Sequence, residues 1–283
     1  MDGARELATH ILMAVMLAII LGQFVLGTRF HRRLLAGLDA DPRRRAVFYT
    51  MIIGYGGVRV AFVLLITFTS VDLTVADVGW AWPGGAIDYA LAAWLLLVIG
   101  IGALRVRGAM ARGRTLPLRA DLAPLIPRTT RERRLAVVVA FAAGITEEAL
   151  YRGLLIAAAT TLYDLPLAAA VAASLVLFVG GHAYQGRRGM LGSAFVGGLF
   201  TALYLISGSL LLPIVVHIVQ DLVALLVIPA HPSTPPPAEP IPARPPDAGP
   251  ARARSGTTPP TVRSASPAGS DMDPHGAAGR PVG

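Results

Sequence analysis

The chain has 283 residues, of which 54% are hydrophobic and only 15% are charged, whereas a soluble domain carries about 25% charged residues. It contains no cysteine, which excludes disulfides, a catalytic thiolate and a cysteine-ligated metal. The net charge is +8 and every basic residue is an arginine. These arginines lie mostly in short segments between apolar blocks, as in the loops of membrane proteins, where basic residues set the orientation of the chain. We therefore expect the lipid bilayer, and no nucleic acid, as a partner.

Seven apolar blocks follow one another along the chain, and most reach the ~20 residues that a helix needs to cross a bilayer. Because lipid offers the backbone no hydrogen-bond partner, each block is predicted to be helical. The predicted fold is all-α, a polytopic membrane bundle of seven or eight transmembrane helices. The blocks cover residues 7–28, 47–69, 81–104, 134–160, 166–183, 189–206 and 209–229.

The segments between the blocks alternate in charge. Residues 29–46, 105–133 and 184–188 are rich in arginine, whereas 70–80 and 161–165 carry only aspartate as a charged residue. The positive-inside rule then places the arginine-rich loops and the C-terminus in the cytoplasm and the N-terminus outside.

Three regions are predicted. Residues 1–133 hold the N-terminal helices with their arginine-rich loops, and residues 134–229 form a core that carries ionisable side chains. Residues 230–283 are rich in Pro, Ala, Gly, Ser and Arg and have few large apolar side chains. Such a segment cannot bury enough surface to offset its chain entropy, so we predict a disordered cytoplasmic tail.

Several ionisable residues lie within the predicted spanning helices. A charge at the centre of such a helix raises the free energy of membrane insertion by roughly 2.5–3.5 kcal/mol. Buried Glu–Arg pairs can simply join helices, and a histidine can be a hydrogen-bonded core residue. Several such residues on three apolar helices, all within residues 147–221, favour a functional site instead. They are Glu147, Glu148, Arg152, His182, His217 and Asp221.

Helical spacing sorts these residues into faces. Glu148 and Arg152 are four apart, so they share one face and can pair in the favourable acid-before-base order. Glu147 is turned by about 100° from Glu148 and projects toward a different neighbour. Two further pairs share a face at the same spacing: Phe178 with His182, and His217 with Asp221.

If the three polar faces converge, two carboxylates and two imidazoles surround a small wet cavity. Glu147 beside His182 could then deprotonate a water molecule as a general base. His217 and Asp221 could stabilise the oxyanion of a tetrahedral intermediate. The same four residues are alternative ligands for a divalent metal such as zinc, because imidazoles and carboxylates suit that ion.

The depths of these residues present a difficulty for a common site. At 1.5 Å per residue, His182 falls near the cytoplasmic end of its block, whereas His217 falls in the outer half of its own. Tilt, helix breaks or a fourth helix that starts later than Arg134 would bring them together, and Gly180 with Gly181 could supply a break.

Two charges outside the core, Arg59 in the second block and Asp88 in the third, also fall at membrane depth. Unpaired charges are not tolerated there, so we expect these two to pair across helices in a structural role.

Three motifs resemble those of the CPBP intramembrane proteases, which include CAAX proteases and bacteriocin-processing enzymes. Residues 147–153, EEALYRG, resemble the EExxxR motif of that family. Residues 178–182, FVGGH, resemble FxxxH, and residues 217–221, HIVQD, resemble HxxxN/D. The resemblance covers about residues 134–229.

The resemblance implies hydrolysis of a peptide bond in a membrane-associated peptide or protein, in the plasma membrane of a bacterium. The family is labelled as metalloprotease, and a metal-free glutamate mechanism is also proposed for it, so metal dependence stays open. Asp221, in place of Asn, is a better metal ligand and a worse oxyanion donor. By position, Glu147 is the base, His182 helps to activate water, His217 and Asp221 form the oxyanion side, and Glu148 and Arg152 are supporting residues.

Two other functions are considered. A non-catalytic membrane scaffold or a bacteriocin self-immunity protein would keep the same fold without chemistry. An ion-coupled transporter is disfavoured, because the sequence has no inverted repeat and no paired broken helices in matching halves. Neither the identity and prenylation of the substrate nor the oligomeric state follows from the residues.

Overall fold

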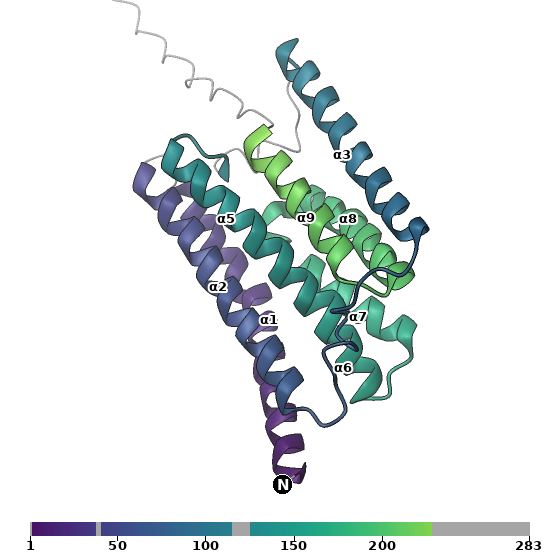
Figure 1. Ribbon diagram of the computed structural model, residues 1–283. Coiled ribbons are helices and arrows are strands. Elements are labelled where there is room, and N and C mark those ends of the chain that lie inside the picture. The colour runs from purple at the N-terminus through teal and green to yellow at the C-terminus, as the bar shows by residue number, and fades with distance from the viewer. Residues whose placement is uncertain (1, 38–40, 115–124, 228–283) are drawn as a thin grey trace, which may run out of the picture. The chain divides into compact units, whose positions relative to one another are not determined.

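A computed structural model describes residues 2–37, 41–114 and 125–227, and every regular element in these ranges is a helix. The predicted all-α fold is confirmed, with one helical segment for each predicted block (Figure 1). The predicted tail at 230–283 lies outside the described residues. The elements are α1 (Asp2–Ala36), α2 (Pro42–Thr69), α3 (Ala86–Ala111), α5 (Thr130–Glu147) continued by η2 (Glu148–Leu155) and α6 (Ile156–Thr161), α7 (Leu167–Gly181), η3 (Ala183–Gln185), α8 (Gly186–Ser207), and α9 (Leu211–Leu222) continued by η4 (Val223–Val227).

Four helical segments are long and apolar enough to cross a membrane: Asp2–Phe24, Arg43–Thr69, Ala86–Ala111 and Ala183–Ser207. Two apolar helices are shorter, Leu167–Gly181 and Leu211–Val227. Large apolar side chains lie on the outside of the bundle, with Leu97 60% exposed and Leu191 72% exposed. Such surfaces are disfavoured in water and suit lipid, so the fold is a helical membrane bundle.

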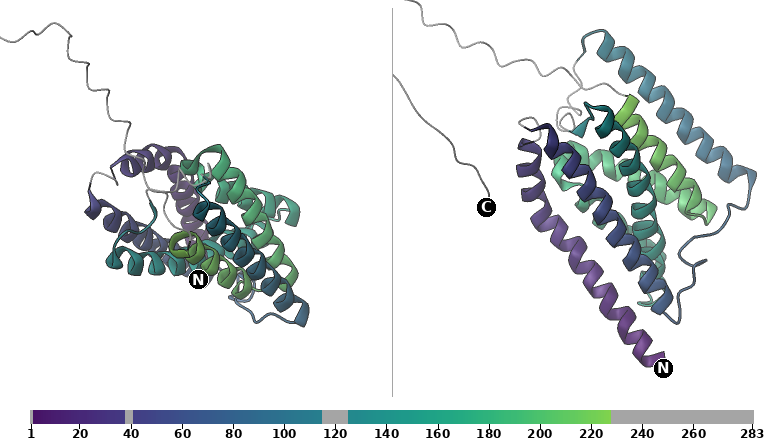
Figure 2. Two further views of the ribbon diagram at one scale, coloured as in Figure 1. Left: turned by 90° about the horizontal axis from the view of Figure 1, so that it is seen from above. Right: turned by 60° about the vertical axis from the view of Figure 1, so that its left-hand side comes forward.

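The helix that carries the two adjacent glutamates lies in the middle of the bundle. α5 packs against α2 on one side and against α9 on another, while η2 contacts α2 and α7. Successive helices run in alternate directions, and α3 lies beside α8 and α9 (Figures 1 and 2). Ionisable residues of α5 and η2 are thereby surrounded by other helices, where a charge can find a partner.

Helix starts in the structure are set by local hydrogen bonds. α5 begins at Thr130 with a capping box, in which Oγ1 of Thr129 accepts from the backbone N–H of Glu132 and Oε2 of Glu132 accepts from the N–H of Thr129. The helix thus starts before Arg134, and the idea of a later start is wrong. α3 begins at Ala86, because Oδ2 of Asp88 accepts from the N–H of Gly85 at 3.0 Å.

A glycine allows α9 to approach α5 closely. A Cβ placed on Gly144 would lie 2.6 Å from Cγ1 of Ile218 and 3.2 Å from the backbone nitrogen of Ile218. Real Cβ atoms essentially never come as close as 2.6 Å to another atom, so a side chain at position 144 would force Ile218 to shift. The close approach brings His217, the neighbour of Ile218, up to the glutamate-bearing helix.

Candidate active site

A cavity of about 380 Å³ lies among α1, α2 and α5 and reaches the end of α7. Most of its wall is apolar, with side chains such as Ile19, Phe48 and Met51. A mostly apolar cavity with a few converging polar groups is the usual form of a binding site. The polar lining includes Gln23, Tyr55, Arg59, Thr146, Glu147 and His182.

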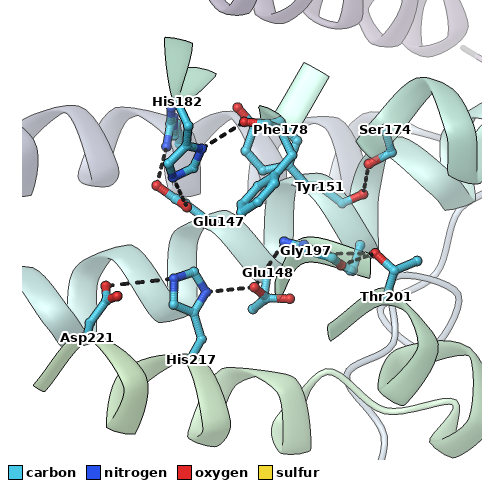
Figure 3. Close-up of polar contacts among 12 residues, drawn as sticks. Glu147, Glu148, Tyr151, Ser174, Phe178, His182, Gly197, Thr201, His217 and Asp221 are labelled. Atoms are coloured by element: carbon cyan, nitrogen blue, oxygen red, sulfur yellow. Dashed lines mark hydrogen bonds and ion pairs between the residues drawn. The ribbon is translucent and has the colours of Figure 1, made fainter. Parts of the chain in front are cut away.

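Glu147 and His182 face each other at the wall of this cavity. Oε2 of Glu147 lies 3.9 Å from Nε2 of His182, and the two side chains are 17% and 20% exposed (Figure 3). Nδ1 of His182 lies 2.8 Å from the carbonyl oxygen of Phe178, which can only accept, so Nδ1 carries the proton. In the neutral ring, Nε2 then presents a lone pair toward Glu147.

The end of helix α7 places His182 next to Glu147. α7 ends at Gly181, and His182 has φ −96° and ψ 7°, outside the helix, before the short turn η3. The break suggested by Gly180 and Gly181 is therefore present. His182 follows the end of α7, and its ring faces Glu147 at the end of α5 (Figure 3).

Arg59 is a site residue that the sequence reasoning missed. Its Nη1 lies 3.5 Å from Oε1 of Glu147, and its Nη2 donates to Oε1 of Gln23 at 2.8 Å. The expected pair with Asp88 is wrong, since Asp88 caps α3 instead. A signal existed in the sequence: once Glu148 was assigned to Arg152, Glu147 was the carboxylate left for a second buried arginine.

Glu148 belongs to a different group, in which it forms a fully buried pair with Arg152. Oε1 of Glu148 accepts from Nη1 of Arg152 at 3.0 Å, as the spacing predicts, and the side chains are 0% and 1% exposed. Arg152 also donates to the carbonyl oxygen of Gly197 at 3.0 Å and to Oγ1 of Thr201 at 3.3 Å. Its guanidinium lies 4.2 Å from the ring centre of Phe178. Arg152 thus ties η2 to α7 and α8.

His217 joins this second group. Its Nδ1 lies 2.7 Å from Oε1 of Glu148, and its Nε2 lies 3.7 Å from Oδ2 of Asp221 (Figure 3). Neither His217 nor Asp221 lines the cavity. The structure therefore differs from the expectation of one shared cavity: Glu147 and His182 line it, whereas Glu148, His217 and Asp221 form a chain of contacts beside it.

The four residues do not fit a zinc ion. Within residues 2–37, 41–114 and 125–227, no three His, Asp or Glu side chains form a group that could hold a metal. Zinc sites use three or four protein ligands around one point. Here the possible ligands form two separate pairs, Glu147 with His182 and His217 with Asp221. The Nδ1 atom of His217 faces Glu148.

Fold and site together define a multi-spanning helical membrane protein with two adjacent carboxylates, each directed to its own imidazole. Residues 131–223 match the family described as type II CAAX prenyl endopeptidase Rce1-like, so this part of the chain is similar to that family. The resemblance drawn from the three motifs is confirmed, and all three lie inside the matched range. Neither the curated proteins nor the solved structures contain a match to the chain.

Proposed function

We propose that this protein is an intramembrane endopeptidase that hydrolyses a peptide bond with water activated by Glu147 and His182. One observation carries the proposal: Oε2 of Glu147 and Nε2 of His182 face each other across 3.9 Å at the wall of a cavity. The match of residues 131–223 to a family of endopeptidases supports the same reaction. A membrane-associated peptide or protein is the proposed substrate.

The pair has the geometry to hold one water molecule. Both groups accept hydrogen bonds, Glu147 as a carboxylate and His182 through Nε2, because Nδ1 donates to the carbonyl of Phe178. A water within about 2.8 Å of both atoms spans a separation of 3.9 Å. Its two protons then point to Glu147 and His182, which leaves an oxygen lone pair free for a substrate carbonyl.

The proposed reaction is a proton-balanced hydrolysis. The water oxygen bonds to the carbonyl carbon of the substrate while Glu147 takes one of its protons. The carbonyl electron pair moves onto the oxygen to form a tetrahedral oxyanion. When this intermediate collapses, the C–N bond breaks, and the proton on Glu147 passes to the leaving nitrogen. The products are a carboxyl terminus and a free amine.

Glu148 and Arg152 are proposed as supporting residues. Arg152 neutralises Glu148, and Glu148 in turn holds Nδ1 of His217 at 2.7 Å. These contacts connect η2, α8 and α9 behind the cavity wall. They keep Glu147, the neighbour of Glu148, in a constant position, and they present Nε2 of His217 to Asp221. An oxyanion role for these last two residues stays a prediction.

The test compares purified wild-type protein with Glu147→Gln in lipid vesicles. The substrates are a pool of membrane peptides and matched peptides with and without a prenylated C-terminal CAAX segment. We expect Glu147→Gln to lower cleavage about 10³-fold. The matched control is Glu132→Gln on the same helix, a buried glutamate paired with Arg45 and outside the cavity lining.

A wild-type protein that cleaves, together with an inactive Glu147→Gln and an active Glu132→Gln, supports the proposal. Cleavage that survives in Glu147→Gln overturns it. A biological function that survives in this variant without any cleavage favours the alternative, a non-catalytic scaffold or self-immunity protein. Preference for the prenylated peptide would assign the substrate class.

A further inference from the structure

Arg59 brings a positive charge to the cavity, next to the proposed base. It comes from the middle of α2 and is 6% exposed. It lines the cavity together with Glu147 and His182, whereas Arg152 does not. Among the described residues, Arg59 is thus the arginine that both lines the cavity and contacts Glu147.

Two of the three guanidinium nitrogens of Arg59 are not firmly hydrogen-bonded. Its contact with Glu147 is 3.5 Å, longer than the 2.7–2.9 Å that is typical of a charged hydrogen bond. Its Nε has no hydrogen-bond partner among the described residues. A buried donor without a partner costs free energy, and such groups call for an explanation in terms of structure or chemistry.

The orientation of Arg59 is nevertheless held. Nη2 donates to Oε1 of Gln23 at 2.8 Å, and the hydroxyl of Tyr55 donates to the same oxygen at 2.8 Å. The guanidinium carbon lies 4.4 Å from the ring centre of Tyr55. A cation that is fixed in advance, with donor capacity to spare, is what stabilises a charge that forms only during a reaction.

We propose that Arg59 stabilises the oxyanion of the tetrahedral intermediate. The inference rests on the proposed function. When water adds to the substrate carbonyl, the carbonyl oxygen takes up the electron pair and becomes negative, while the proton goes to Glu147. Arg59, on the same wall, neutralises that oxygen until the C–N bond breaks. His217 and Asp221, predicted for this role, lie outside the cavity lining.

A second ion pair between the same two helices serves as an internal comparison. Nη1 of Arg45 lies 3.2 Å from Oε1 of Glu132, and the side chains are 1% and 3% exposed. Like Arg59 with Glu147, this pair joins α2 to α5. It does not line the cavity, and Glu132 serves the capping box of α5. Arg45 is therefore a matched control for the purely structural effect of losing such a pair.

The experiment measures kcat, KM and thermal stability for Arg59→Gln, Arg59→Lys and Arg45→Gln in vesicles. We expect Arg59→Gln to lower kcat about 100-fold or more while KM changes less than about threefold. Arg59→Lys keeps the charge but lacks the planar guanidinium that Gln23 and Tyr55 hold in place, so kcat should fall about tenfold. Arg45→Gln should lose stability and keep kcat.

Two results would overturn the inference. The first is a kcat of Arg59→Lys within about threefold of wild type, which decides the question even if Arg59→Gln does not fold. The second is full recovery of kcat in Arg59→Gln at higher pH, since Arg59 would then only keep Glu147 ionised. Failure of the proposed function is seen separately, as activity that survives in Glu147→Gln.

Discussion

Oε1 of Glu148 lies 2.7 Å from Nδ1 of His217 and so connects η2 to α9. The same oxygen accepts from Arg152 at 3.0 Å, so one carboxylate oxygen serves two partners on different helices. Oε2 of Glu148 has no hydrogen-bond partner among the described residues. Its neighbour Glu147 contacts neither of these partners within ion-pair distance, and faces Arg59 and His182 instead.

The buried pair of Glu148 and Arg152 leads to the first prediction. Arg152→Met leaves a carboxylate that is 0% exposed without its cation, which should lower the free energy of unfolding by about 3–5 kcal/mol. The double variant Glu148→Gln with Arg152→Met should recover part of this loss, because no charge is then left buried. Unfolding by denaturant in micelles measures both. Equal losses in the single and double variants would contradict a charge-pair origin.

The position of His182 at the end of α7 leads to the second prediction. We expect His182→Ala to lower kcat about 100-fold, because Nε2 no longer accepts from the water. Stability should change little, since the side chain is 20% exposed and its described hydrogen bond is to the carbonyl of Phe178. Peptide cleavage and thermal unfolding in the same vesicles measure the two effects. A loss of stability that parallels the loss of activity would point to a structural role.

Two adjacent glycines of α8 give the third prediction. A Cβ on Gly197 would lie 2.8 Å from Cε1 of Phe178 and 3.1 Å from Nη2 of Arg152, whereas a Cβ on Gly198 meets nothing within 4 Å. Gly197→Ala should therefore cost about 1–3 kcal/mol of stability by overpacking. It should also weaken the bond of Arg152 to the carbonyl of Gly197. Gly198→Ala is the control and should be neutral in an unfolding measurement; equal effects would rule out the steric explanation.

The arrangement of the donors leads to the fourth prediction. The imidazoles and carboxylates form pairs, and no group of three that could hold a metal is found in the described part of the chain. We expect cleavage to be retained after dialysis against a strong chelator. Mass spectrometry of the same sample should give less than one zinc ion per chain. Stoichiometric zinc that is lost together with activity in His182→Ala would contradict this expectation.

The sequence by itself determined the features that depend on local spacing. Apolar blocks of bilayer length predict the seven helical segments, because the backbone in lipid must bond to itself. The separation of four residues predicts the bond between Glu148 and Arg152, and it forms even though η2 is wound as a π-helix. The paired glycines before His182 mark the end of α7 in the same local way.

Only the tertiary structure decided which residues of different helices meet. Spacing along one helix indicates a face, but the partner of that face depends on the rotation and depth of the neighbouring helices, which packing sets. The crossing of α5 and α9 at Gly144 and Ile218 brings His217 to Glu148. The packing of α2 on α5 brings Arg59, expected beside Asp88, to Glu147. The division of the ionisable residues into a cavity pair and a second group around Glu148 follows from these contacts.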